Sequence, residues 1–578
     1  MIKMCASFHI SSRILKSDLK WSYVHGASNI PLLGITVGKQ LQAMVESCPD
    51  RDAMVFFQDR VKLTFGELLE KSDKLAAGLQ ALGIQRGDCF GILGPNSAEW
   101  VLTQYASARA GFILVNINPS YKRDELKYAL LKSGCKGIVT APSFKSQNYV
   151  QMLTEIIPEL TSLPQGAPIN SKELPNMKHI ITMGPKHYPG TLLFDDVLNQ
   201  ATPSQIQNIV DTQDLIQFDD PVNIQFTSGT TGSPKGAVLT HHNIVNNSYF
   251  VGLRCGYHVH DAVICVPVPL YHCFGMVMAC LQSITHGATC VWPSQVFDVP
   301  TVLKSIEEFR CTSLYGVPTM IIDILNHPLC EKTDTSSLVT GIMAGSPCPI
   351  ETMKAVLEKL KIHKITVCYG STETSPVTLQ STGECSFDKR VSTVGKVLDH
   401  QEVKIVDTEG RIVPIGTSGE LCTRGSSTML GYWKDPEKTK DVITPDQWYH
   451  TGDLAIMTEE GYCKISGRIK DMLIRGGENI YPLEIEQILY KHPKIKDVQV
   501  IGVPDTRLGE QVCAWIVPKT DMTLTEQEVK EFCKDKMARY KIPHYVIFVE
   551  DYPKTVSGKV QKYIMRERSI EQLGLVCQ

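Results

Sequence analysis

The stretch FTSGTTGSPKG, residues 226–236, decides how the rest of the sequence is interpreted. It holds three glycines, three threonines, two serines and one lysine. Glycines let the backbone approach phosphate oxygens closely, while hydroxyl groups and the lysine supply hydrogen-bond donors and charge. The stretch does not fit the Walker A pattern, because Pro234 precedes Lys235 and Gly236 follows it. It therefore predicts a phosphate-binding loop of a different kind.

A second lysine in a similar setting lies more than three hundred residues further along the chain. It is Lys559 in PKTVSGKV, residues 553–560, where Gly558 precedes it. This stretch also departs from Walker A, since it begins with proline and Val560 follows the lysine. The sequence thus offers phosphate two separate lysines, one near the middle of the chain and one near its end.

The composition is that of a large globular protein. The chain has 578 residues, of which 43% are hydrophobic and 21% charged, so we expect more than one domain. A net charge of −3 gives no general reason to expect nucleic acid as a partner. No apolar run reaches about 18 residues, so no transmembrane segment is predicted. The 19 cysteines are scattered without any CxxC pair, which favours free thiols over a disulfide framework or a zinc site.

The first four fifths of the chain alternate between helical and strand patterns. LTFGELLEKSDKLAAGLQALGI (63–84) has apolar residues at helical spacing, and CFGILGPNS (89–97) predicts a buried strand that ends in a turn. WVLTQYASARAGFILVNINP (100–119) repeats the cycle, and AVICVPVPL (262–270) and KITVCYG (364–370) are further strand candidates. Such alternation predicts layered α/β subdomains with parallel sheets.

The pattern changes towards the C-terminus. HQEVKIVDTEGRIVPIGTSGELCTRG (400–425) alternates apolar and polar residues, which predicts an antiparallel β unit. GRIKDMLIRGGENIYP (467–482) then precedes a compact α+β pattern. We predict a basic N-terminal segment over 1–35, a large domain over 36–469 and a small mobile domain over 470–578.

Three more motifs carry side chains suited to a nucleotide. In VCYGSTETSP (367–376), Tyr369 ends a buried strand and can stack on a planar ligand, Thr372 can donate to phosphate, and Glu373 suits Mg²⁺. In WYHTGDLA (448–455), Asp453 can accept hydrogen bonds from a ribose diol. In the 467–482 stretch, Arg468 can neutralise phosphate. Taken alone, each motif also fits an ordinary turn or a charged linker.

Together, the five motifs in this order and spacing resemble the adenylate-forming superfamily of acyl-CoA synthetases, luciferases and adenylation domains. The resemblance covers roughly residues 36–568. Within the superfamily the sequence is similar to mitochondrial acyl-CoA synthetases of the medium-chain type. The runs that carry this similarity are NIQFTSGTTGSPKGA, HHNIVNNS, LYGVPTMIIDILN and IRGGENIYP.

The resemblance implies a role for each motif in binding ATP. Tyr369 would lie beside the adenine, and Asp453 would take the ribose with Arg468 nearby. Thr372 would meet the α-phosphate, and Glu373 would coordinate Mg²⁺. The β- and γ-phosphates would lie in the loop formed by Thr227, Ser228, Gly229, Thr230, Thr231, Gly232, Ser233, Pro234 and Lys235.

The resemblance also implies a two-step reaction. Lys559 would bridge the substrate carboxylate and the α-phosphate while a fatty acid and ATP form acyl-AMP and pyrophosphate. The small domain would then rotate about a hinge at Lys470 and bring the Gly477 face beside the pantetheine arm of CoA, so that acyl-CoA and AMP form.

For the acyl group, the resemblance implies a gate at His272 in PLYHCFG (269–275) and a pocket lined near Tyr315 and Gly345. A purely structural role for His272 stays open. The substrates would be a fatty acid, ATP and CoA, and medium chain length rests on the resemblance alone.

Other functions remain possible at this stage. A peptide-synthetase adenylation domain often places an aspartate near the gate motif, whereas LYHCFGMVM here has no acid. A luciferase-like oxygenase, a carboxylate-adenylating enzyme with another acceptor, and a non-catalytic ATP- or acyl-binding homologue also stay open.

The first residues suggest a destination. MIKMCASFHISSRILKSDLKW has four basic residues against Asp18 alone and several serines, which is typical of a mitochondrial transit peptide. An ordinary irregular start is the alternative. The final VCQ does not fit a peroxisomal signal. We expect a location in the mitochondrial matrix rather than the cytoplasm.

Overall fold

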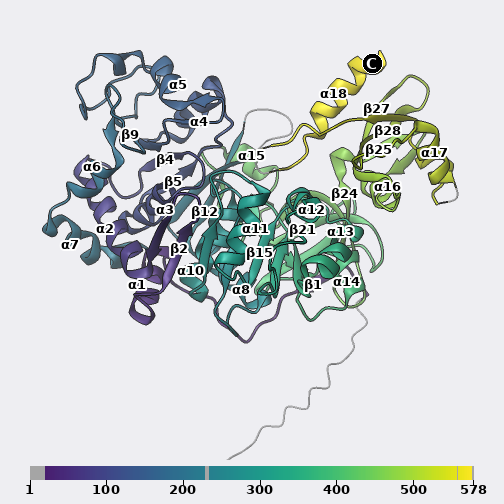
Figure 1. Ribbon diagram of the computed structural model, residues 1–578, viewed down its shortest axis with the longest axis horizontal. Coiled ribbons are helices and arrows are strands. Elements are labelled where there is room, and N and C mark those ends of the chain that lie inside the picture. The colour runs from purple at the N-terminus through teal and green to yellow at the C-terminus, as the bar shows by residue number, and fades with distance from the viewer. Residues whose placement is uncertain (1–19, 228–233, 535, 556–557, 576–578) are drawn as a thin grey trace, which may run out of the picture.

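The computed structural model describes residues 20–227, 234–534, 536–555 and 558–575 (Figure 1). It has mixed α/β architecture, as the alternating sequence pattern predicts. Two large sheets, a smaller antiparallel sheet and a C-terminal sheet account for nearly all of its strands.

The first large sheet ends at the predicted phosphate loop. Five successive pairings, from β10 to β11, are parallel, and β12 and β22 then add antiparallel strands. The strands in spatial order are β10 (Leu192–Leu193), β9 (His179–Thr182), β6 (Gly137–Thr140), β4 (Cys89–Leu93), β5 (Ile113–Asn116), β11 (Pro221–Thr227), β12 (Lys235–Thr240) and β22 (Gly431–Tyr432). The predicted strands at 89–97 and directly before the loop are confirmed.

The second large sheet has a parallel centre with antiparallel edges. Its order is β19 (Lys396–Val397), β18 (Leu379–Gln380), β17 (Lys364–Tyr369), β16 (Thr340–Met343), β15 (Ser313–Gly316), β13 (Val263–Cys265), β14 (Thr289–Trp292), β2 (Asp52–Phe56) and β3 (Val61–Thr64). The strand expected over 262–270 stops at Cys265, because Pro267 and Pro269 have no backbone N–H to donate to a central ladder.

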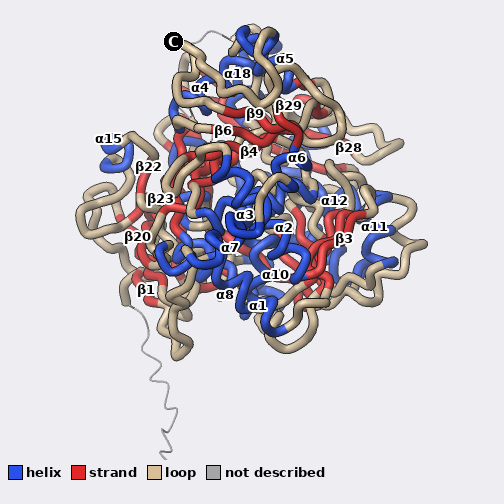
Figure 2. Tube along the Cα trace, turned by 90° about the vertical axis from the view of Figure 1, so that its left-hand side faces the viewer, coloured by secondary structure: helices blue, strands red, loops and turns tan. Residues whose placement is uncertain are grey.

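Helices fill the space between these two sheets (Figure 2). One group packs on β4 and β5 of the first sheet, and another reaches β14 and β17 of the second. They are α1 (Val37–Ser47), α2 (Phe65–Ala81), α3 (Ala98–Ala110), α8 (His241–Cys255) and α10 (Leu281–His286). The helices predicted within 63–84 and 100–119 are among them.

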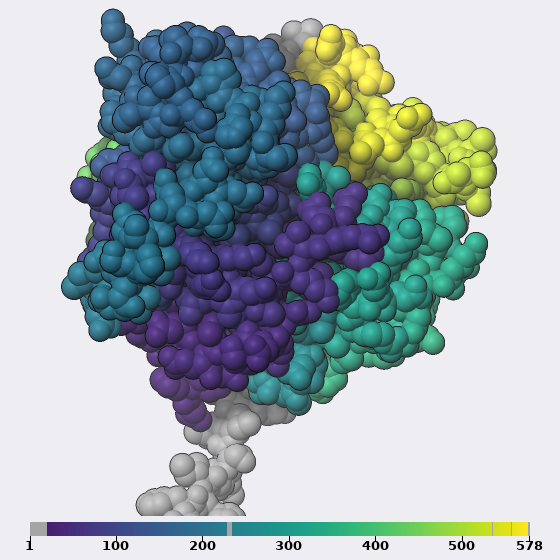
Figure 3. Space-filling view, turned by 60° about the vertical axis from the view of Figure 1, so that its left-hand side comes forward, coloured from purple at the N-terminus to yellow at the C-terminus, as the bar shows by residue number. Residues whose placement is uncertain are grey.

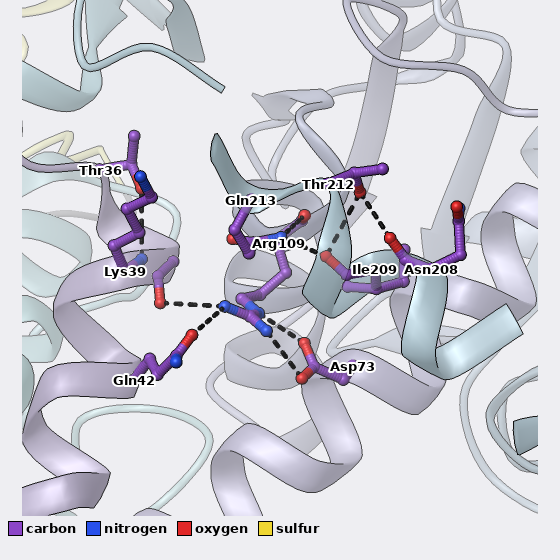
Figure 4. Close-up of polar contacts among 10 residues, drawn as sticks. Thr36, Lys39, Gln42, Asp73, Arg109, Asn208, Ile209, Thr212 and Gln213 are labelled. Atoms are coloured by element: carbon purple, nitrogen blue, oxygen red, sulfur yellow. Dashed lines mark hydrogen bonds and ion pairs between the residues drawn. The ribbon is translucent and has the colours of Figure 1, made fainter. Parts of the chain in front are cut away.

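A buried ion pair ties three of these helices together (Figure 4). Arg109 on α3 is 1% exposed, and its guanidinium contacts the Asp73 carboxylate on α2 at 2.5 and 2.9 Å. The same guanidinium donates to the carbonyl of Gly38 on α1. A buried charge is tolerated only when it is paired in this way, so removing either partner would destabilise the fold strongly.

The remaining helices of the large part lie outside this central layer or in connections. They are α4 (Arg123–Ser133), α5 (Tyr149–Ile156), α6 (Phe194–Asn199), α7 (Pro203–Asp211), α9 (Cys273–Gly275), α11 (Val299–Glu308), α12 (Pro318–Asn326), α13 (Ile350–Ala355), α14 (Phe387–Ser392) and α15 (Pro436–Lys440).

The predicted β unit is an antiparallel five-stranded sheet. Its order is β1 (Tyr23–His25), β20 (Gln401–Val406), β21 (Gly419–Gly425), β23 (Tyr449–Met457) and β24 (Cys463–Arg468). Strand β1 comes from the segment that we expected to lie apart from the large domain. It pairs with β20, so at least this part of the 1–35 segment belongs to the folded body.

The C-terminal residues form a small α+β unit at one end of the molecule (Figures 1 and 3). Its sheet has the order β26 (Glu478–Ile480), β25 (Leu473–Arg475), β28 (Gly509–Pro518) and β27 (Ile495–Asp505), with β29 (Tyr545–Phe548) parallel to β28. The helices are α16 (Pro482–Leu489), α17 (Glu526–Lys534) and α18 (Lys562–Leu573). The loop before α18 carries Lys559 back towards the large part.

Neither a membrane-crossing helix nor a disulfide occurs among the described residues. No described helix combines the length and the apolar character that a bilayer crossing requires. The 17 described cysteines are all free thiols, and most of them are buried.

Candidate active site

The side chains of several predicted motifs meet around Lys559. Glu373, Asp453 and Arg468 lie close enough for their charges to act on the lysine, and so does the thiol of Cys273. Burial lowers the pKa of Lys559, Arg468 lowers it further, and the acidic groups oppose this shift. The loop of the small C-terminal unit thus places its lysine inside the site formed by the large part.

The phosphate loop begins and ends on a strand ladder. Thr227, the last residue of β11, pairs with Lys235, the first residue of β12, and its hydroxyl donates to the Lys235 carbonyl at 3.4 Å. The carbonyl of Pro234 accepts a hydrogen bond from the Tyr128 hydroxyl at 3.3 Å. The predicted loop residues between them, Ser228, Gly229, Thr230, Thr231, Gly232 and Ser233, lie outside the described residues.

A tyrosine joins this loop to the predicted metal ligand. The Lys235 ammonium lies 5.0 Å from the ring centroid of Tyr432, which is within the range of a cation–π contact. The Tyr432 hydroxyl donates to Glu373 Oε1 at 3.0 Å. Glu373 is only 8% exposed, and its carbonyl accepts from the Met429 N–H at 2.9 Å. A single side chain, Tyr432, therefore contacts both the Glu373 carboxylate and the loop lysine.

Asp453 is held between an arginine and a tyrosine. Strand register places Asp453 on β23 opposite Arg468 on β24, and the arginine Nε lies 3.3 Å from Asp453 Oδ1. The Tyr369 hydroxyl donates to Asp453 Oδ2 at 2.6 Å. Burial raises the pKa of Asp453, against the effects of Arg468 and Tyr369. The structure thus brings together three residues that the sequence singles out from three separate motifs.

Thr372 and His272 face the same region. Thr372 begins a short 3₁₀ turn (Thr372–Thr374), and its hydroxyl lies 3.8 Å from the Cys273 thiol. His272 caps α9, and its Nδ1 accepts the N–H of Phe274 at 3.1 Å. Burial, together with the charge of Lys559, lowers the pKa of His272 to about 3. His272 is therefore a neutral ring at physiological pH.

Gly345 and Tyr315, the two residues predicted to line an acyl pocket, both lie in the interior near the gate motif. Gly345 has φ +93°, and a Cβ added there would lie 3.1 Å from Val317 Cγ1 and 4.0 Å from Lys559 Cε. The positive φ favours glycine here, and a side chain would also crowd Val317. Tyr315 is fully enclosed, and its ring stacks on Phe274 at 5.7 Å.

The two residues predicted to serve the second step lie further out. Lys470 is exposed in a short 3₁₀ turn (Ile469–Asp471) between β24 and β25. Gly476 and Gly477 form the two-residue turn between β25 and β26, with φ values of +59° and +86°. No atom lies within 4 Å of a Cβ placed on Gly477. Gly477 is open to solvent in this arrangement and is not among the residues gathered at Lys559.

Glu420 and His450 form a support for Asp453 that the sequence analysis missed. Glu420 Oε2 lies 2.8 Å from His450 Nδ1, and Glu420 Oε1 accepts the Gly452 N–H at 3.0 Å. The Thr451 hydroxyl accepts the Asp453 N–H at 3.1 Å. His450 lies within the WYHTGDLA motif, but its partner lies 30 positions earlier on β21. Only the strand pairing reveals their contact.

Comparison with known proteins places this site in a family. Residues 41–433 match the family model described as AMP-binding enzyme, and residues 484–559 match that described as AMP-binding enzyme C-terminal domain. The chain belongs to the AMP-binding enzyme family. The adenylate-forming resemblance predicted from the motifs is thereby confirmed.

Individual relatives of this AMP-binding enzyme agree with that assignment. It is 49% identical over 573 residues to the "Medium-chain acyl-CoA ligase ACSF2, mitochondrial" of Danio rerio, a match that covers 99% of this chain and 94% of that protein. Among solved structures, anthranilate CoA ligase AuaEII in complex with anthranoyl-AMP aligns with a TM-score of 0.82 at 26% identity, covering 95% of this chain and 99% of that chain. ATP-bound MatB from Rhodopseudomonas palustris aligns with a TM-score of 0.80 at 28% identity, covering 94% and 100%.

Proposed function

We propose that this AMP-binding enzyme is an ATP-dependent acid–thiol ligase that joins a medium-chain fatty acid to CoA. In the first half-reaction the acid and ATP give acyl-AMP and pyrophosphate. In the second the CoA thiol displaces AMP and forms the thioester. The observation that carries this proposal is the position of the Lys559 side chain, which lies 4.0 Å, at Cε, from a Cβ added at Gly345 of the large part and is within range of the charges of Glu373, Asp453 and Arg468.

The first half-reaction needs positive charge at one point. A carboxylate and a triphosphate repel each other, so attack on the α-phosphorus is slow unless cations lie where negative charge develops. Lys559 and Arg468 are the cations that supply that charge. A substrate carboxylate oxygen bonds to the α-phosphorus as the bond to pyrophosphate breaks. Since the substrate itself is the nucleophile, the protein needs no nucleophilic side chain.

The nucleotide lies along the polar residues of the site. The loop from Thr227 to Lys235 takes the β- and γ-phosphates, Thr372 takes the α-phosphate and Tyr369 lies beside the adenine. Asp453 accepts the ribose hydroxyls. Each carboxylate oxygen has two lone-pair sites, so Asp453 can keep its Tyr369 and Arg468 contacts while it binds the ribose.

Glu373 fits the role of a Mg²⁺ ligand. Mg²⁺ binds proteins through one or two carboxylates together with substrate phosphates, and Glu373 is a buried carboxylate that accepts a hydrogen bond from Tyr432, whose ring contacts the Lys235 ammonium. When bound, Mg²⁺ would neutralise phosphate charge. Glu373 would hold it, and Tyr432 keeps that carboxylate in place.

The second half-reaction needs a different arrangement of the small C-terminal domain, taken here to begin at residue 470. Lys559 fills the space beside the carboxylate, so a thiol cannot approach the acyl carbon along that path. Rotation about Lys470 withdraws Lys559 and brings the Gly477 turn to the pantetheine arm of CoA. The exposure of Lys470 and the open surroundings of Gly477 support this proposal.

The test is to incubate the purified enzyme with ATP, Mg²⁺, CoA and straight-chain acids of increasing length. AMP and acyl-CoA are measured together. Equal amounts of both, with a maximum at medium-chain acids, are expected. Pyrophosphate without thioester would point to another acceptor, and no pyrophosphate with any acid would leave a binding protein.

We also propose import into the mitochondrial matrix, directed by the basic N-terminal segment. The relative from Danio rerio carries the word mitochondrial in its name, and residues 1–35 hold the basic, serine-containing pattern. A reporter fused to these residues should collect in mitochondria. A fusion in which Lys3, Arg13, Lys16 and Lys20 are replaced by glutamine should stay in the cytoplasm.

A further inference from the structure

Strand β15 leads from Lys559 into the interior. Val317, which follows β15 in extended conformation, has a methyl group beside Gly345 and hence next to Lys559. Side chains two residues apart share a face of a strand, so Tyr315 and Ser313 continue this face inward. At about 3.3 Å per residue, the face runs about 13 Å from Val317 to Ser313. An alkyl chain whose carboxylate met Lys559 would have this face as its path.

A pair of tyrosines closes the path. The Tyr257 hydroxyl donates to the Tyr315 hydroxyl at 3.0 Å and lies 2.7 Å from the Ser313 hydroxyl. Ser313 and Tyr315 are fully buried, and Tyr257 is 2% exposed. The stacking of Tyr315 on Phe274 connects this end to the gate motif. The inward face therefore ends at Tyr257.

An open hollow lies on the other side of Tyr257. It has a volume of about 560 Å³, and its lining includes Tyr257, Tyr249, His286 and Val259. The Tyr257 ring meets His286 edge-on at 6.3 Å, and His286 stacks on Tyr249 at 5.3 Å. Val259 is 74% exposed, so the hollow opens to solvent. Tyr257 is thus the partition between this hollow and the interior face of β15.

The end of α8 fixes the partition. Gly256 takes a left-handed conformation, with φ +79°. The Tyr257 N–H bonds to the Gly252 carbonyl and the Gly256 N–H to that of Leu253, each at 3.0 Å. This is the Schellman pattern, which directs the residue after the glycine back onto the helix. A Cβ on Gly252 would lie 2.3 Å from the His286 ring, so α8 and α10 are in close contact here.

We propose that Tyr257 is the floor of the acyl pocket and sets the longest straight-chain fatty acid that the enzyme accepts. The proposal rests on the acid–thiol ligase function proposed above. The methyl end of a medium-chain acid lies against the Tyr257–Tyr315 pair, and a longer acid is excluded by the Tyr257 ring. Removing that ring joins the pocket to the outer hollow and gives a longer chain a way out to solvent.

The experiment measures kcat/KM for a series of saturated acids with the wild-type enzyme, Tyr257→Ala and Val259→Ala. Val259 lines the same hollow, and the Tyr257–Tyr315–Ser313 contacts do not involve it. Because one methylene in a hydrophobic pocket changes kcat/KM by about 10–200-fold, Tyr257→Ala should raise the ratio of long-chain to medium-chain kcat/KM at least about tenfold. Val259→Ala should keep the wild-type profile.

Two further variants keep the test possible if Tyr257→Ala does not fold. Tyr257→Phe keeps the ring and should keep the chain-length maximum, whereas Tyr257→Leu should move it in the direction of Tyr257→Ala. Thermal unfolding shows which variants are folded. If Tyr257→Leu is also unfolded, Val317→Leu decides: it adds bulk on the same face near Lys559 and should move the maximum to shorter acids.

The possible results separate this proposal from the one on which it rests. If the wild-type enzyme is active but the chain-length profile is unchanged in folded Tyr257→Ala or Tyr257→Leu, the floor alone is overturned. Where neither variant folds, an unchanged profile in Val317→Leu has the same meaning. A wild-type enzyme that makes no acyl-CoA from any acid overturns the ligase function, and the floor with it. A shift to longer acids in Tyr257→Ala but not in Val259→Ala supports both.

Discussion

The nucleotide half and the acyl half that we propose for the site are held in different ways. In the nucleotide half, neighbouring strands place Asp453 opposite Arg468, and hydrogen bonds from Tyr369 and Tyr432 fix the carboxylates. In the acyl half, Tyr315 and Tyr257 come from a strand and a helix end that are far apart in sequence. Strand pairing and charge position the residues of the nucleotide half, whereas side-chain volume shapes the acyl half. We therefore expect substitutions to change catalysis in the former and substrate choice in the latter.

The largest effect is expected at the lysine that joins the halves. Lys559→Ala should lower acyl-CoA formation from acid and ATP by about 10²–10³, the usual cost of losing one group that stabilises developing charge. Steady-state assays at saturating substrate measure this. Lys554→Ala is the control, because Lys554 lies in the same loop but pairs with Asp551. Similar losses in both variants would mean that the loop, and not the Lys559 charge, matters.

A smaller effect is expected at the ribose side of the nucleotide half. Asp453→Asn keeps the shape but removes the charge, and hydrogen bonds to charged groups contribute about 1.5–3 kcal/mol. The KM for ATP should rise at least about tenfold, while the chain-length profile stays the same. Asp446→Asn, at an exposed acid that precedes the same strand, should leave the KM unchanged. A changed chain-length profile in Asp453→Asn would contradict the separation of the halves.

The support behind Asp453 should show a weaker effect of the same kind. Glu420→Ala leaves the Gly452 N–H without its acceptor, which costs about 1–3 kcal/mol. We expect a several-fold rise in the KM for ATP with little change in kcat. Glu420→Gln retains an oxygen for the Gly452 N–H and should restore most of the affinity. A fall in kcat that glutamine does not rescue would argue against a positioning role.

The smallest effect concerns stability. Glu420 raises the pKa of His450, and His450 helps to lower the pKa of Glu420. The stabilisation from His450 is fully present below its unfolded-state pKa of about 6.5 and is lost as pH rises through the higher folded-state value. Both side chains are partly exposed, so about 1 kcal/mol or less is at stake.

Thermal unfolding of wild type and His450→Gln at two pH values tests this contribution. The wild-type advantage should be larger at a mildly acidic pH, between the ordinary pKa values of glutamate and histidine, than at an alkaline pH. An advantage that grows with pH would show that the ion pair contributes nothing.

Local patterns predicted much of this molecule. The helical spacing in 63–84 corresponds to α2 (Phe65–Ala81), and the alternation in 400–425 corresponds to the antiparallel pair β20 and β21. The motif residues were found because glycines, hydroxyls and charges cluster in short stretches. Asp453 and Arg468, in particular, lie on adjacent strands at the site.

What the sequence did not predict depends on contacts between distant residues. Glu420 reaches His450 only through the pairing of β21 with β23. In the sequence, Tyr257 has no feature beyond following a helix. In the structure, its hydroxyl donates to that of Tyr315, 58 positions later. The apolar run over 262–270 predicted a longer strand than β13, which ends at Cys265 because Pro267 and Pro269 cannot donate to the ladder. Periodicity detects one face of an element, but it does not show what that face meets.

The central claim is that one lysine serves the first half-reaction and leaves before the second. The most direct test supplies purified acyl-AMP and CoA to Lys559→Ala and follows single-turnover thioester formation, next to adenylate formation from acid and ATP. Adenylate formation should be lost while thioester formation stays near the wild-type rate. Equal loss of both half-reactions would contradict the account, because Lys559 would then be needed throughout.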